Sequence, residues 1–156
     1  MNPVSLYLHI PFCRHRCSYC DFNTYTSLQD LQGDYVAALE EEIAQVAGLA
    51  WRAGQLRAVN TLFFGGGTPS LLTESQVGRL ISAVEAAFGF TADPEITLES
   101  NPETVDYNYL AAVWDAGINR LSFGMQSADA IELELLGRTH DVAAVFEAVR
   151  QARAAR

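Results

Sequence analysis

The chain alternates short apolar segments with longer amphipathic ones. The short segments predict β-strands at 4–10, 59–64, 95–100 and 120–126. Apolar residues at helical spacing predict helices at 33–51, 73–89, 104–116, 129–136 and 141–155. The helix that begins at Thr73 has Gln76 three residues later, which is the pattern of a capping box. The chain is therefore predicted to be a succession of strand–helix units.

Four strand–helix units in succession predict an α/β fold with parallel strands and right-handed crossovers. An open doubly wound sheet and part of a (β/α) barrel both fit this order. In three of the strands apolar residues alternate with polar ones such as His9, Glu99 and Ser122, so the sheet has one apolar and one polar face. We favour the barrel, because a polar inner face suits a bound ligand and Glu99 would otherwise be buried without a purpose.

The number of units is too small for a complete barrel. A whole (β/α) barrel takes roughly 250 residues, whereas this chain has 156. We therefore expect residues 1–156 to form the N-terminal part of a larger core domain, with the rest of the barrel absent. Because an unfinished sheet exposes an edge, we expect this chain alone to be unstable or to aggregate.

Composition indicates an ordinary globular domain, with 49% hydrophobic and 19% charged residues. The net charge of −9 argues against a nucleic-acid or membrane surface, and the basic residues at 14–16 form only a small local island. The N-terminus lacks a signal-peptide pattern, and no segment approaches the roughly 18 apolar residues of a membrane span. We therefore expect a cytoplasmic protein.

The three cysteines of the chain lie within eight residues, as Cys13, Cys17 and Cys20, just after the first predicted strand. In a reducing cytosol, clustered thiols are more often metal ligands than disulfides. One hypothesis is zinc, with His9 or His15 as the fourth ligand. The other is a four-iron cluster in which one iron keeps an open coordination position. The spacing favours the cluster.

Glycines and polar residues stand at the ends of the other predicted strands. Glycines 65–67 follow the second strand and would let the backbone approach a ligand closely. Glu99 and Gln126 end the third and fourth strands, and Arg138 could form a bidentate contact with a substrate carboxylate. Sites in (β/α) barrels form at the carboxyl ends of the strands. These residues and the cysteines therefore predict one common site.

The motifs YLHIPFCRHRCSYCDF, GGGTPS, ESNPET, NRLSFGMQS and LLGRTH occur in an order that resembles the radical S-adenosylmethionine family, and within it the oxygen-independent coproporphyrinogen III oxidase group. The resemblance covers essentially the whole chain. It implies a partial TIM-like barrel with a 4Fe–4S cluster on Cys13, Cys17 and Cys20, whose remaining iron binds S-adenosylmethionine. It also implies that the following residues contact S-adenosylmethionine: Tyr7, Tyr19, Gly66, Gly67, Thr68, Glu99, Gln126 and Arg138.

The residues after the third cysteine distinguish two branches of this group. The coproporphyrinogen dehydrogenases carry a further cysteine two residues after the third, whereas this chain has Phe22 there, after Asp21. The sequence CDF resembles the heme chaperone branch. That resemblance implies heme as cargo, with heme acceptor proteins and an electron donor for the cluster as partners, and membrane contact only through acceptors. An oxygen-independent coproporphyrinogen III oxidase and a zinc-binding structural domain remain as alternatives.

Overall fold

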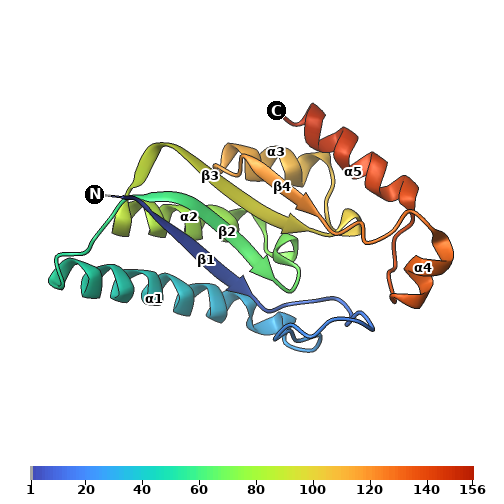
Figure 1. Cartoon of the computed structure of the whole chain (residues 1–156), viewed down its shortest axis with the longest axis horizontal. Coiled ribbons are helices and arrows are strands. Elements are labelled where there is room, and N and C mark those ends of the chain that lie inside the picture. The colour runs from blue at the N-terminus through green and yellow to red at the C-terminus, as the bar shows by residue number, and fades with distance from the viewer. Residues whose placement is uncertain (1) are drawn as a thin grey trace.

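The computed structural model describes residues 2–156 as a four-stranded parallel sheet with helices packed against it (Figure 1). The strands lie in sequence order and are β1 (Val4–Ile10), β2 (Val59–Gly66), β3 (Phe90–Ser100) and β4 (Arg120–Phe123). The helices are α1 (Gln32–Arg52), α2 (Glu74–Phe88), α3 (Tyr107–Asp115), α4 (Ala130–Leu135) and α5 (Val142–Ala154). Short 3₁₀ turns occupy Gln29–Leu31, Pro69–Leu71 and Pro102–Thr104. The predicted α/β fold of four units is confirmed, and the sheet formed by the described residues is not closed.

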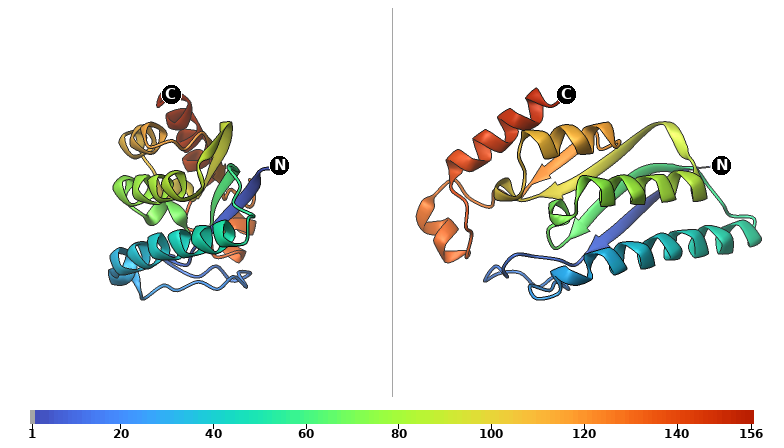
Figure 2. Two further views of the ribbon diagram at one scale, coloured as in Figure 1. Left: turned by 90° about the vertical axis from the view of Figure 1, so that its left-hand side faces the viewer. Right: turned by 180° about the vertical axis from the view of Figure 1, so that it is seen from behind.

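The sheet has one apolar and one polar face, as the alternation predicted. Helices α1, α2 and α3 lie on the same side of the sheet (Figure 2). The strand register places Leu8, Phe64, Leu98 and Leu121 in one row across all four strands, and this row packs into the main hydrophobic core. Tyr7, on the opposite face of β1, is 55% exposed. The helices therefore bury one face and leave the other available for a site.

Helix α2 begins as the sequence predicted. The Thr73 side chain accepts a hydrogen bond from the Gln76 backbone N–H, and the Gln76 side chain accepts one from the Thr73 backbone N–H. This capping box satisfies two N–H groups that the first turn of a helix leaves free. None of the helices in residues 2–156 has both the length and the apolar character needed to cross a bilayer.

Three predicted boundaries were wrong by three residues or more. The strand expected from residue 95 begins at Phe90. The helix expected from residue 104 begins at Tyr107, because Asp106 caps it by accepting a hydrogen bond from the Tyr109 backbone N–H (2.8 Å). The strand expected to reach residue 126 ends at Phe123. The last interstrand bond near its end runs from the Gly124 N–H to the Ser100 carbonyl (3.0 Å), after which the backbone turns. Gln126 therefore lies beyond the strand, with a φ of 65°.

Strand β4 pairs only with β3 among the described residues. Beside it lies a groove of about 180 Å³ between α3 and α5, with apolar and basic side chains along its walls. Trp114 is one of the lining residues and is 41% exposed. An open strand edge with apolar side chains beside it is a template for self-association.

We predict that the 156-residue chain alone self-associates through this edge. The variant Trp114→Lys should weaken the association, because it places a charge beside the open strand. Trp51→Lys is the matched control, since Trp51 lies on α1 and is 71% exposed. Sedimentation velocity over a range of concentrations measures the effect. A monomer at every concentration with a cooperative thermal transition would contradict the prediction.

Candidate functional site

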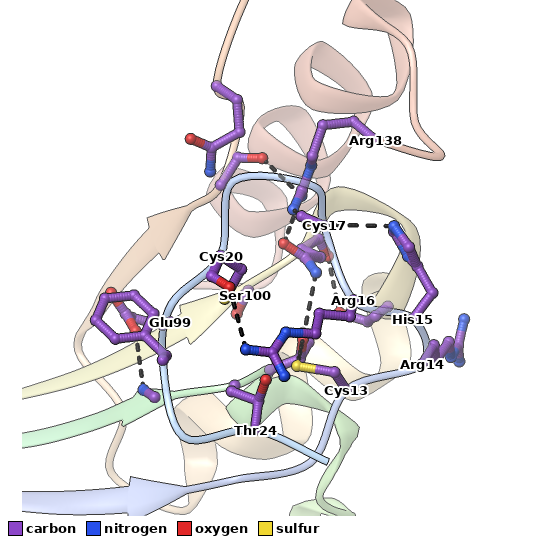
Figure 3. A pocket seen from close by; sticks show the side chains of 18 of the residues that line it. Cys13, Arg14, His15, Arg16, Cys17, Cys20, Thr24, Glu99, Ser100 and Arg138 are labelled. Atoms are coloured by element: carbon purple, nitrogen blue, oxygen red, sulfur yellow. Dashed lines mark hydrogen bonds between the residues drawn. The ribbon is translucent and has the colours of Figure 1, made fainter. Parts of the chain in front are cut away.

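A cavity of about 710 Å³ lies at the carboxyl ends of the strands (Figure 3). Its walls come from the loop after β1, the glycine run that ends β2, the residues that follow β3 and β4, and Arg138. Most of the predicted site residues line it, namely Cys13, Cys17, Cys20, Tyr19, Gly66, Gly67, Thr68, Glu99, Gln126 and Arg138. Tyr7 is the exception. Segments far apart in the sequence thus meet in one place.

The first cysteine is fixed by backbone hydrogen bonds within its own loop. The Cys13 N–H donates to the Tyr25 carbonyl (3.0 Å), and the Tyr25 N–H donates to the Pro11 carbonyl (2.7 Å). The Gln29 side chain donates to the Cys13 carbonyl (2.7 Å). Cys13 is buried, and burial raises the pKa of its thiol. A cation bound there would favour the thiolate and so oppose this effect.

The other end of the cysteine loop is attached to the chain around α4. The Ser18 hydroxyl donates to the Leu135 carbonyl (2.9 Å), and the Ser18 N–H donates to the Leu136 carbonyl (3.3 Å). The Arg138 guanidinium donates to the Sγ of Cys17 (3.3 Å). These bonds span more than a hundred residues of sequence, so the position of the loop depends on the C-terminal third of the chain.

The glycine run is held against the cysteine loop by its backbone. The Gly67 N–H donates to the Ile10 carbonyl and the Thr68 N–H to the Phe12 carbonyl, both at 2.8 Å. A Cβ atom on Gly67 would lie 2.6 Å from the Phe12 carbonyl oxygen and 3.0 Å from the Sγ of Cys13. Only glycine allows the backbone at position 67 to come this close to Cys13. The hydroxyl of the next residue, Thr68, lies 3.7 Å from the Sγ of Cys13.

Gly66 needs glycine for a second reason. Its φ is 113°, a conformation that other residues rarely adopt, and a Cβ there would lie 2.6 Å from the His9 imidazole. Its N–H donates to a carboxylate oxygen of Glu99 (3.4 Å). Tyr7 lies farther along the polar face, where its ring stacks on that of Phe63 and its hydroxyl lies 3.2 Å from the Nδ1 of His9.

Gln126 reaches the cavity from an unusual backbone conformation. Within residues 2–156 it is the one residue other than glycine with a positive φ. A Cβ on Gly124, two residues earlier, would lie 2.9 Å from the Oδ1 of Asn101 and 3.1 Å from the Nε2 of Gln126. The segment 124–126 therefore packs tightly against the end of β3. Such conformations cost energy and cluster at functional sites.

Several buried polar atoms in the cavity wall have no hydrogen-bond partner within residues 2–156. They include the Nε of Arg138 and the Oγ of Ser100. Buried polar atoms are almost always paired in native proteins, so a wall with unpaired ones fits a polar ligand. The cavity therefore combines three thiols, exposed glycine backbone and free polar groups.

The three thiols fit the donor set of a multi-iron cluster. All three cysteines are free, and no group of three His, Cys, Asp or Glu side chains in residues 2–156 is close enough to hold one metal ion. A cluster binds each thiolate to a different iron atom, so its ligands lie farther apart than those of one ion. His9 lies with its ring nitrogens near the Tyr7 hydroxyl and the Asn23 carbonyl (2.9 Å). It does not turn toward the sulfurs as a zinc ligand would, whereas His15, the other histidine of the zinc hypothesis, has its Nε2 3.9 Å from the Sγ of Cys17 and beside the Gly137 carbonyl.

Comparison with protein families gives the same assignment for the chain as a whole. The family model described as "Radical SAM superfamily" matches residues 7–156. The chain belongs to the radical SAM superfamily. Membership implies a 4Fe–4S cluster and S-adenosylmethionine as cofactors, and the donors described above fit both.

Three individual proteins illustrate the similarity. The chain is 43% identical over 149 residues to the "Radical S-adenosyl methionine domain-containing protein 1, mitochondrial" of Bos taurus, covering 96% of this chain and 33% of that protein. It is 41% identical over 141 residues to the "Heme chaperone HemW" of Escherichia coli, covering 90% and 36%. The solved structure of coproporphyrinogen III oxidase (HemN) from Escherichia coli superposes with a TM-score of 0.86 at 36% identity, covering 97% and 34%. The chain thus spans about a third of the length of these relatives.

Some residues of the cavity wall were missed by the sequence reasoning. Ser100, Glu103, Ser122 and Gly124 all line the cavity, and His140 lies directly behind Arg138. All of them fall inside or beside the motifs that carry the family resemblance. The motifs indicate that these residues belong to the site. The sequence does not show which motif residues face the cavity and which support their neighbours.

We predict that Gly67→Ala prevents assembly of the iron–sulfur site. The added methyl group would overlap the Phe12 carbonyl and displace Cys13. Iron and sulfide content after anaerobic reconstitution should fall to a small fraction of the wild-type value. Gly33→Ala is the matched control, because a Cβ at Gly33 in α1 meets nothing within 4 Å and should leave the content unchanged. Full iron content in Gly67→Ala would refute the proposed role of this glycine.

Proposed function

We propose that this protein is a heme chaperone of the radical SAM superfamily that binds a 4Fe–4S cluster and S-adenosylmethionine and delivers heme to acceptor proteins. In this proposal the protein works in the cytoplasm, with heme acceptors and a one-electron donor as its partners. The single observation that carries the choice is the segment after Cys20, where Asp21 and Phe22 stand in place of a further cysteine.

The cavity supports the cofactor part of the proposal. The thiolates of Cys13, Cys17 and Cys20 would hold the cluster. S-adenosylmethionine would contact the remaining predicted residues, which are Tyr7, Tyr19, Gly66, Gly67, Thr68, Glu99, Gln126 and Arg138. When bound, the two groups together supply radical chemistry. The protein's own residues provide ligands, orientation and a positive charge at Arg138.

The chaperone part depends on the number of thiols at the site. A cysteine at position 22 would add a fourth thiol, because Asp21 and Phe22 both line the cavity. Phe22 is instead 67% exposed and offers no metal ligand. The missing fourth thiol at position 22 favours heme handling over porphyrin oxidation.

A second candidate function is oxygen-independent coproporphyrinogen III oxidation. The TM-score of 0.86 to the oxidase favours it, since the fold around the cavity is shared. Fold similarity alone does not fix chemistry, however, because one fold carries different functions through different site residues. We therefore rank the oxidase second.

We further propose that residues 1–156 are the N-terminal part of a longer core domain. The chain spans about a third of its relatives, and its described sheet has an open edge at β4. Further cofactor contacts and the heme site would then lie in the remainder, so tests of function need the full-length protein.

The deciding experiment compares heme binding with porphyrin turnover in the same anaerobic preparation. We expect the reconstituted full-length protein to bind hemin in an absorbance titration and to transfer it to apo-myoglobin as a test acceptor. With coproporphyrinogen III, S-adenosylmethionine and dithionite, we expect no vinyl-containing product by chromatography.

A Phe22→Cys variant serves as the comparison, because it restores the spacing of the oxidase branch without changing the other ligands. Protoporphyrinogen formed by the wild-type protein at enzymatic rates would replace the proposed function with the second candidate. Absence of any hemin binding by the wild-type protein would refute the chaperone proposal.

A further inference from the structure

Asn101 is the first residue after β3, and it lines the cavity. Its backbone carbonyl accepts hydrogen bonds from the Thr104 N–H (3.0 Å) and from the Thr104 hydroxyl (2.8 Å). The short 3₁₀ turn that contains Thr104 therefore fixes the backbone of Asn101. The amide side chain is left to bond with two other segments of the cavity wall.

The two polar atoms of this amide have different partners. The Oδ1 accepts a hydrogen bond from the Nη2 of Arg138 (2.6 Å), and the Nδ2 donates to the hydroxyl oxygen of Thr68 (3.3 Å). A guanidinium can only donate, so the atom that faces Arg138 is the amide oxygen. The amide nitrogen then faces Thr68. The partners of Asn101 thus determine which way its amide points.

The bond from Asn101 orients the Thr68 hydroxyl. A hydroxyl has one hydrogen to donate and lone pairs that accept. Because the Thr68 oxygen accepts from the Nδ2 of Asn101, its own hydrogen is free to point elsewhere, and the Sγ of Cys13 lies 3.7 Å from the oxygen. Thr68 is buried, so water does not compete for this hydrogen. Thr68 is therefore a donor to the sulfur of Cys13.

The Oδ1 of Asn101 orients Arg138 in a similar way. The Nη2 of Arg138 donates to this oxygen and to the Gly124 carbonyl (3.0 Å), and these two bonds use both of its hydrogens. They fix the plane of the guanidinium. The Nη1 then donates to the Sγ of Cys17 (3.3 Å). One amide thus contacts two donors, and each donor faces a different cysteine.

We propose that Asn101 is a positioning residue that directs two hydrogen-bond donors to two cysteine sulfurs. Its Nδ2 directs the Thr68 hydroxyl to Cys13. Its Oδ1 holds the Arg138 guanidinium beside Cys17. A donor stabilises negative charge on a ligand sulfur, and that charge is larger in the reduced cluster, so Asn101 makes the cluster easier to reduce. This inference rests on the proposed 4Fe–4S cluster, and heme transfer plays no part in it.

The first test removes the amide in the reconstituted full-length protein. Asn101→Leu keeps the approximate size of the side chain but neither donates nor accepts. We expect the equilibrium constant for one-electron reduction to fall about tenfold, which is a midpoint potential about 59 mV more negative. A redox titration without S-adenosylmethionine, followed by electron paramagnetic resonance, measures the potential. Asn60→Leu is the matched control and should leave the potential unchanged, because Asn60 lies near the start of β2 and bonds to Thr91.

A double-mutant cycle separates orientation of the Thr68 hydroxyl from packing. Thr68→Val removes the hydroxyl and should make the potential more negative, whereas Thr68→Ser keeps it and should stay near the wild-type value. Asn101→Asp keeps the shape of the side chain and an oxygen toward Arg138, but its second oxygen accepts the Thr68 hydrogen and turns it away from Cys13. Thr68→Val should therefore shift the potential much less when Asn101→Asp is present. The charge added by Asn101→Asp cancels from this comparison.

An equal effect of Thr68→Val with and without Asn101→Asp would overturn the inference, and this cycle decides the question even if Asn101→Leu does not fold. A shift in Asn101→Leu no larger than that in Thr68→Val would overturn the part that concerns Arg138. Hemin binding and iron content measured in parallel keep the two proposals apart. A wild-type protein with a full cluster but no hemin binding refutes only the chaperone function. Unchanged potentials in variants with a full cluster refute only the role of Asn101, and a wild-type protein that assembles no cluster refutes both.

Discussion

Two backbone hydrogen bonds between the end of β1 with its following loop and the residues after β2 determine where Cys13 lies. They run from Gly67 to Ile10 and from Thr68 to Phe12, and they continue the pairing of the two strands beyond their ends. The contact brings Cys13 beside a backbone that has no room for a Cβ atom at Gly67. The other walls of the cavity are then positioned relative to this contact, because β3 and β4 extend the same sheet.

The parallel arrangement explains why the rest of the site gathers at the same edge. Every strand ends there, so Glu99 at the end of β3 and the segment after β4 face the cysteine loop without long connections. Helices α1, α2 and α3 cover the apolar face of the sheet, and polar side chains occupy the opposite face. The alternation of apolar and polar residues along the strands therefore buries the core on one face and exposes the site on the other.

Most elements could be predicted from the sequence because they follow local patterns. Alternation of apolar and polar residues indicated the strands, and the Thr73 capping box indicated the start of α2. The spacing of the cysteines predicted a metal site, and the fold brings all three cysteines to one cavity. The end of β4 and the position of Gln126 could not be predicted, since a positive φ in a residue other than glycine depends on tertiary packing. The burial of His140 was missed for a similar reason, because the fold brings Met125 and Glu103 to it.

The hydrogen bonds that attach Ser18 to the chain around α4 have a consequence for the order of folding. They join residues 117 or more positions apart, so they form only after most of the chain has been made and packed. A chain synthesised from its N-terminus exposes its thiols early but completes their surroundings late. Iron delivered before that moment would meet a flexible peptide, and iron delivered afterwards would meet a built site.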